Sequence, residues 1–174
     1  MKSWQWFLML GAIAILLLPF AAWIVGRSLS AEHTAESSID IDADVELVAA
    51  RVRDVEQQPR WRKKVQKIAV EGREGGAVFY REFSAGEQVA YAFYEREADR
   101  VFESVVNDKT LPYGGRWLIS LEGGKGRPTK VRVREEGIVY SPMYRALGRY
   151  VFGFDSTLKA YLQDLAQSFL RDPK

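Results

Sequence analysis

The pattern of hydrophobic and polar positions divides the chain into two parts. From Trp4 to Val25, 19 of 22 residues are apolar and none is charged. A helix of this length rises about 33 Å, enough to cross the ~30 Å hydrocarbon core of a bilayer. Trp4 and Trp23 lie near its two ends, where interfacial aromatic residues are common. The pattern therefore predicts an N-terminal transmembrane anchor in residues 1–26.

A cleaved signal peptide is the alternative for this segment. Ser28 and Ser30 have the small-residue spacing of a cleavage site, and Lys2 supplies a minimal basic region. The apolar run is longer than the usual stretch of about 7 to 15 residues, which favours an uncleaved anchor. Lys2 and the α-amine precede the run and Arg27 follows it, which favours an N-in, C-out orientation. In a bacterium, this orientation places the following domain in the periplasm.

The residues after the anchor predict a linker and then the start of a folded domain. Residues 27–37 show no apolar periodicity, which indicates a juxtamembrane linker. The domain is expected over residues 38–171. Ile39 and Ile41 alternate with aspartates, which is typical of a half-buried strand. Apolar residues then recur at helical spacing after Asp44, a favourable N-cap residue.

Six further strands are predicted, because short apolar segments are separated by turns that contain Gly, Asn or Asp. They are expected at residues 65–71, 77–83, 88–95, 100–106, 116–122 and 129–140. Turns this short cannot form the crossover that parallel strands need, so the sheet of about seven strands is expected to be antiparallel. A long amphipathic helix is predicted over residues 142–170, because apolar residues recur every three or four positions from Leu147 to Phe169; Gly153 is expected to break or kink it.

The order of predicted strands and helices indicates an α+β domain in which a curved antiparallel sheet wraps around one long C-terminal helix. Four segments carry a resemblance to a known family: residues 39–44, 54–61, 115–117 and 136–145. The order and spacing of these segments resemble those of the SRPBCC superfamily. This is the START-like or polyketide cyclase/dehydrase group, which has the helix-grip fold. The resemblance runs from about Ile39 to Phe169, and some members of this family are tethered to a membrane.

The resemblance implies a deep apolar cavity between the sheet and the C-terminal helix. The expected ligand is a small hydrophobic molecule such as a lipid, a sterol, a polyketide or an aromatic compound. The resemblance does not imply one reaction, because this fold hosts cyclases, hydratases and lipid carriers.

Composition narrows the chemistry further. The 174 residues include no Cys and a single His, His33, which excludes thiolate metal sites and cysteine nucleophiles and disfavours a histidine-based triad. The 25 Lys and Arg nearly balance the 23 Asp and Glu, so charge gives no argument for nucleic-acid binding. We therefore expect no metal, no cofactor and no nucleic-acid partner, whereas protein partners stay open.

Three charged residues are predicted to face the inside of the sheet. Strand phase puts Glu135 on the face of Val131 and Val133, and similar reasoning places Glu103 and Arg81 inward. An unpaired buried charge costs several kcal/mol, so these groups should pair, reach water or shift their pKa. One hypothesis is a polar cluster that orients a ligand or performs acid/base chemistry. The alternative is a β-bulge that shifts the phase, or a position near the strand ends.

Aromatic side chains are the other candidates for the cavity wall, although about half of them should be ordinary core. They are Tyr80, Tyr91, Phe93, Phe102, Trp117, Tyr150, Phe154 and Tyr161. The candidate ligand-binding residues are Arg81, Tyr91, Phe93, Glu103, Trp117, Glu135, Tyr150 and Phe154. No catalytic residue is assigned, because no nucleophile–base pair is visible. A dense basic cluster in residues 60–67 either contacts anionic headgroups next to the anchor or forms a solvated face beside an inward-packed Trp61.

These observations favour a single-pass anchored domain that binds a hydrophobic small molecule or lipid without catalysis. Two alternatives stay open. The first is a cyclase- or hydratase-type enzyme that uses Glu103, Glu135 or a tyrosine. The second is a membrane-proximal interaction module whose groove holds a segment of a partner protein.

Overall fold

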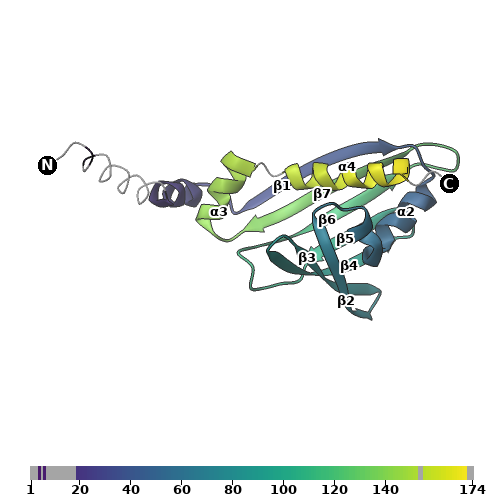
Figure 1. Ribbon diagram of the computed structural model, residues 1–174, viewed down its shortest axis with the longest axis horizontal. Helices are drawn as coiled ribbons and strands as arrows, with labels where there is room; N and C mark the ends of the chain where they lie inside the picture. The colour runs from purple at the N-terminus through teal and green to yellow at the C-terminus, as the bar shows by residue number, and fades with distance from the viewer. Residues whose placement is uncertain (1–3, 5, 7–18, 153–154, 172–174) are drawn as a thin grey trace.

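A seven-stranded antiparallel sheet forms the body of the protein in this computed structural model, which describes residues 4, 6, 19–152 and 155–171 (Figure 1). Its order is β1-β7-β6-β5-β4-β3-β2, so the first strand pairs with the last. The strands are β1 (Glu32–Ile41), β2 (Val65–Glu74), β3 (Ala77–Ser84), β4 (Glu87–Glu97), β5 (Val101–Val106), β6 (Tyr113–Glu122) and β7 (Thr129–Val139). The predicted antiparallel sheet is confirmed.

Helices occupy the two connections that leave the sheet. Between β1 and β2 lie α2 (Val45–Arg53) and a 3₁₀ helix, η1 (Val55–Arg60). After β7 come α3 (Pro142–Leu147), a π-helical segment, η2 (Gly148–Phe152), and α4 (Ser156–Arg171). The predicted C-terminal helix is thus divided near the expected break, and α4 alone runs along β1 and β7 (Figure 1).

The core lies between the sheet, α2 and α4. Leu158, Leu162 and Leu165 follow helical spacing on α4 and are at most 2% exposed, as is Phe102 of β5. Val48 of α2 is fully buried against the same cluster. Burial of side chains of this size contributes about 1.5–3 kcal/mol each, which fixes both helices on the sheet.

The first strand begins earlier than its apolar pattern indicates. β1 starts at Glu32 and pairs residue by residue with β7, so residues 32–37 belong to the sheet and not to a linker. Burial alternates along this stretch, but the half-buried positions hold His33, Ala35 and Ser37. A search for apolar periodicity cannot detect a strand whose inward residues are small or polar.

The predicted membrane anchor falls mostly outside the described residues, which exclude 1–3, 5 and 7–18. Residues 19–28 form a helix that leads toward β1 (Figure 1). Within the part of the chain that the structure describes, no helix has the length and apolar character needed to cross a membrane. The anchor therefore stays a prediction from the sequence.

Candidate functional site

A cavity of about 400 Å³ lies between the sheet and α4. Its deep wall holds the buried side chains of Tyr80, Phe93 and Tyr161, while Lys64 and Glu87 line it at the exposed surface. Cavities of roughly 300–1,000 Å³ with apolar walls and a few polar groups are typical of small-molecule sites. The space is thus large enough for a ligand and connected to the outside.

Packed aromatic rings give this cavity a rigid wall. Tyr161 of α4 meets Trp117 of β6 edge-on, with ring centroids 5.6 Å apart, and meets Trp61 in the same way at 5.4 Å. Tyr80 and Tyr91 stack at 5.4 Å across β3 and β4. These separations fall within the favourable range for aromatic pairs, so the rings hold one another in place.

An ion pair lies within the cavity wall. Arg62 donates from Nη1 to Glu82 Oε2 at 2.6 Å and from Nη2 to Glu82 Oε1 at 3.3 Å. Its Nη1 also donates to Gln58 Oε1 at 2.9 Å. Burial by itself would lower the pKa of Arg62, but the charge and hydrogen bond of Glu82, together with Tyr80 and Tyr161, outweigh it and the pKa is raised. Arg62 therefore stays charged, and hydrogen bonds to Glu82 and Gln58 satisfy its guanidinium inside the wall.

Three phenols of the wall remain neutral at physiological pH. Burial raises the pKa of Tyr80 to about 12, and it also raises the pKa values of Tyr91 and Tyr161. Among the described residues, the buried hydroxyl of Tyr161 has no hydrogen-bond partner. An unsatisfied buried hydroxyl costs about 1–3 kcal/mol, which makes this group a candidate contact for a bound ligand.

Glu135 supplies the acidic group of the cavity. Trp117 hydrogen-bonds its carboxylate, and His33 Nε2 lies 3.6 Å from its Oε1. Burial raises the pKa of Glu135, although His33 and Trp117 act in the opposite direction. A carboxyl group with a raised pKa in a cavity wall can accept or donate a proton, so it is a candidate acid/base residue.

Four of the eight predicted site residues line the cavity: Tyr91, Phe93, Trp117 and Glu135. Of the others, Tyr150 is 68% exposed on η2, and Phe154 lies outside the described residues. That the four lining residues bind a ligand stays a prediction.

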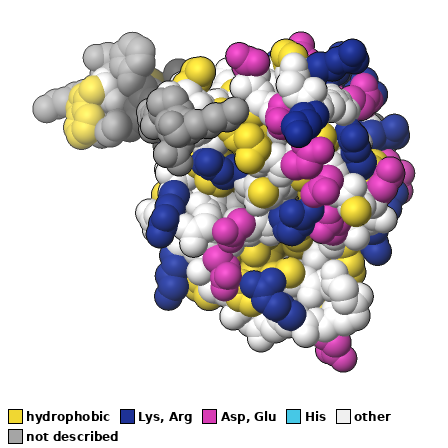
Figure 2. Space-filling model, turned by 90° about the vertical axis from the view of Figure 1, so that its right-hand side faces the viewer, with side chains coloured by type: hydrophobic (Ala, Val, Ile, Leu, Met, Phe, Trp, Pro, Cys, Tyr) yellow, Lys and Arg dark blue, Asp and Glu magenta, His cyan; other side chains and the backbone are white. Residues whose placement is uncertain are grey.

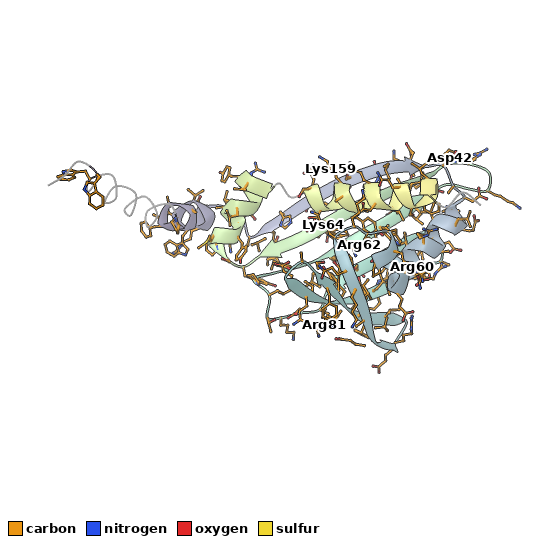
Figure 3. All side chains as sticks on the ribbon, in the orientation of Figure 1. Asp42, Arg60, Arg62, Lys64, Arg81 and Lys159 are labelled. Atoms are coloured by element: carbon orange, nitrogen blue, oxygen red, sulfur yellow. The ribbon has the colours of Figure 1, made fainter. Side chains whose placement is uncertain are left out.

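The predicted cluster of Arg81, Glu103 and Glu135 does not form. Arg81 lies away from α4 (Figure 3) and donates to Glu71 at 2.8 Å. Glu103 is 5% exposed because Arg96 and Arg116 cover it, each donating to its carboxylate.

The error behind this prediction is one of strand phase. In β3 and β5 the inward positions hold Tyr80, Glu82 and Ser104, and apolar residues occupy the outward positions too. Strands with apolar residues on both faces give no reliable alternation. The same phase error concealed Glu82 as a wall residue.

Arg62 also belongs to the wall but was not among the candidates, whereas Tyr80 and Tyr161 were among the aromatic residues expected to line a pocket. The only sequence signal for Arg62 was the basic cluster of residues 60–67, and Tyr161 was part of the apolar stripe of the last helix. His33, which reads as a linker residue, reaches Glu135 because β1 extends to Glu32. Long-range strand pairing, which places these residues, is invisible in a local pattern.

A wider groove of about 1,180 Å³ lies between α2, η1 and the second half of α4. Its margins carry charged side chains, including Asp54, Arg60 and Asp164. Tyr80, Tyr91, Trp117 and the Arg62–Glu82 pair line the smaller cavity and not this groove, so we place the candidate site in the smaller cavity. No group of three or more metal-ligating side chains occurs in the described ranges.

Residues 32–171 match the family described as polyketide cyclase/dehydrase and lipid transport. The chain belongs to this family. The expected place in the SRPBCC superfamily is thereby confirmed. No curated protein matches the chain in sequence.

Several solved structures share the fold at low sequence identity. The Zhui aromatase/cyclase from a Streptomyces species is 14% identical with a TM-score of 0.69, over 80% of this chain and 94% of that one. A START superfamily protein from Mycobacterium smegmatis is 14% identical with a TM-score of 0.62, over 80% and 98%. Truncated norcoclaurine synthase from Thalictrum flavum is 10% identical with a TM-score of 0.66, over 83% and 98%. These similarities establish the helix-grip-like fold.

Proposed function

We propose that this protein is a membrane-anchored binding domain for a hydrophobic small molecule or lipid. The ligand is held between the sheet and α4. The observation that carries the proposal is the cavity of about 400 Å³, walled by packed aromatic rings that include Tyr161. Since the volume is near the lower end of the usual range, a single ring system or one acyl chain fits better than a large lipid.

The polar groups of the wall favour a ligand that carries at least one hydrogen-bonding group. Arg62 and Glu82 satisfy each other, whereas the Tyr161 hydroxyl has no partner in the described part of the chain. A ligand carbonyl or hydroxyl at this point would satisfy that phenol and fix the ligand's orientation. The family description, which names lipid transport beside cyclase chemistry, agrees with a binding role.

A cofactor-free cyclase or hydratase is the second candidate, and Glu135 is the observation that favours it. Its carboxyl group has a raised pKa, lines the cavity and is held by Trp117 and His33. Such a group could move a proton to or from a bound substrate. Glu103 no longer supports this alternative, because it lies on the outer face under two arginines.

Native mass spectrometry of the detergent-extracted full chain tests the binding proposal. We expect a co-purifying small molecule, and Val106→Trp should remove it because Val106 lines the cavity. Val105→Trp is the matched control, since this neighbour on β5 is not part of the wall. A wild-type chain that carries no ligand, and whose melting temperature responds to no hydrophobic compound, would refute binding.

Glu135→Gln separates the two candidates once a ligand is identified. In a binding protein the variant should still retain the ligand, whereas in an enzyme it should retain the substrate without converting it. The N-in, C-out orientation belongs to the same proposal, and C-terminal reporter fusions test it. Activity of a reporter that works only in the cytoplasm would contradict the periplasmic placement.

A further inference from the structure

Exposed apolar side chains gather at one end of the domain, where the helix of residues 19–28, α3 and η2 meet. We call the group the α3-end patch; its defining members are Trp23, Ile24, Met143, Tyr144, Tyr150 and Val151, each at least 40% exposed. Among the described residues from 26 onward, the only large apolar side chains this exposed outside the end containing the patch are Leu47 and Leu170. A contiguous exposed apolar surface of this kind marks an interaction site.

Close contacts hold the parts of this patch together. Gly26 packs so tightly on Pro142 that a Cβ at this position would overlap the Pro142 carbonyl group. Arg145 of α3 donates to the carbonyl of Leu29 at 3.4 Å and to that of Val139 at 2.7 Å. The patch therefore has a fixed orientation relative to the helix that follows the apolar N-terminal run.

Charge at this end suits a negatively charged surface. Residues 1–31 and 137–154 contain no acidic residue, although the chain has 23 of them, and they include Arg27, Arg145 and Arg149. The opposite end of the domain, which faces the viewer in Figure 2, shows acidic and basic side chains interspersed. Basic residues beside exposed Trp and Tyr are the composition that binds the headgroup region of an anionic bilayer.

One part of the cavity wall lies at the same end. Tyr113 and Gly114 line the cavity at the start of β6, and Tyr113 pairs with Val139, three residues before α3. The Tyr140 N–H donates to the carbonyl of Pro112 at 2.8 Å, which ties this part of the wall to the patch. A surface that covers the patch would therefore lie next to it.

We propose that the α3-end patch lies in the headgroup layer of the bilayer that holds the N-terminal helix, so that the cavity mouth faces the membrane. The inference rests on the anchor of the proposed function, because the helix of residues 19–28, which carries Trp23 and Ile24, contains the end of the apolar run from Trp4 to Val25. A hydrophobic ligand then passes between bilayer and cavity without crossing bulk water.

Single-cysteine labelling tests this placement, because the natural chain has no cysteine. The full chain carries Val151→Cys or Met143→Cys with an environment-sensitive fluorophore. It is reconstituted in vesicles of phosphatidylcholine and phosphatidylglycerol. Leu170→Cys is the control, since Leu170 is an exposed apolar residue at the far end of α4. All three positions are on the surface, so labelling should leave the fold and the circular dichroism spectrum unchanged.

We expect headgroup-level spin-labelled lipid to quench the labels at positions 143 and 151 several-fold more than the label at position 170. Equal quenching at all three positions would overturn the placement, and so would a chain that does not float with the vesicles. Native mass spectrometry of the protein from the same vesicles measures, independently of the quenching, whether a ligand is retained. Ligand retained without differential quenching refutes the placement alone, whereas quenching without any ligand refutes the binding function alone.

Discussion

Arg62 forms two hydrogen bonds to the carboxylate of Glu82, at 2.6 and 3.3 Å, in the wall of a cavity that several aromatic rings also line. Both side chains are less than a fifth exposed. The guanidinium carbon also lies 5.6 Å from the ring centroid of Tyr161, so the pair touches the helix as well as the sheet. This contact links η1 and β3 to α4 through a single polar group.

Removal of one partner of this pair should destabilise the fold strongly. Arg62→Met leaves Glu82 buried without its counter-charge, and such losses cost about 3–5 kcal/mol. The double variant Arg62→Met/Glu82→Leu should recover most of this loss, because no charge is left unpaired. Urea unfolding of the purified protein measures both values.

Arg81→Met is the matched control for this prediction. Arg81 also pairs with a glutamate, Glu71, but on the exposed outer face, so its loss should cost less than about 1 kcal/mol. Similar costs for Arg62→Met and Arg81→Met would mean that water screens the cavity pair and would contradict its structural role.

Tyr161→Phe should separate the stability of the fold from the affinity for a ligand. The hydroxyl has no partner among the described residues, so its removal should leave the unfolding free energy unchanged or raise it by up to about 1–3 kcal/mol. If the ligand satisfies this hydroxyl, its affinity should fall roughly tenfold, equivalent to about 1.4 kcal/mol. Thermal unfolding measures the change in stability, and ligand titration independently measures the change in affinity.

Tyr80→Phe provides the comparison, because the hydroxyl of Tyr80 hydrogen-bonds Ser104. This variant should lose about 0.5–1.5 kcal/mol of stability. A Tyr161→Phe variant that is destabilised as much as Tyr80→Phe would indicate a hydrogen-bonded structural hydroxyl and would remove Tyr161 from the proposed ligand contacts.

The strands of the sheet could be predicted because the turns between them could be recognised in the sequence. Gly, Asn and Asp between short strands predict both the strands and their antiparallel pairing, and the structure agrees from β2 to β7. The beginning of β1 was not predictable in this way. Residues 32–37 are ordered by pairing with β7, nearly a hundred residues later, and not by a local apolar pattern.

The cavity wall was only half predictable for a related reason. Glu135 was placed correctly because Lys and Arg alternate with Val along β7. On β3, Phe79 and Phe83 lie outside while Tyr80 and Glu82 lie inside, so hydrophobicity points to the wrong face. Glu82 can be buried because Arg62, which is distant in the sequence, pairs with it. The sequence of β3 alone does not reveal this partner.

Gly137 should resist substitution because of His33. The two residues pair across β7 and β1, and a Cβ on Gly137 would overlap the imidazole ring. Gly137→Ala should therefore cost about 1–3 kcal/mol, the range for overpacking. In Gly72→Ala, the strand control, a Cβ meets nothing within 4 Å.

A double-mutant cycle identifies the cause of that cost. With His33→Ala in place, Gly137→Ala should lose most of its effect, which gives a favourable coupling energy. Urea unfolding of the four chains provides the measurement. Additive effects would mean that the strain lies in the backbone and not in contact with the imidazole ring.

Glu135 and Glu136 are adjacent on β7 and should respond to pH in opposite directions. Burial raises the pKa of Glu135, so the folded protein holds this proton more tightly than the unfolded chain. As pH rises above the ordinary glutamate value of about 4.3 and through the folded value, ionisation of Glu135 therefore lowers stability. Glu135→Gln removes this loss, so its advantage over the wild type should appear with rising pH and then level off.

Glu136 supplies the matched control. The hydrogen bond from Arg116 lowers its pKa, so the ionised Glu136 stabilises the fold above the ordinary glutamate value. Glu136→Gln should consequently lose stability at neutral pH and match the wild type in acid. Urea unfolding across the pH range compares the three chains. A Glu135→Gln profile parallel to the wild type would mean that Glu135 titrates normally, and its raised pKa would no longer support an acid/base role.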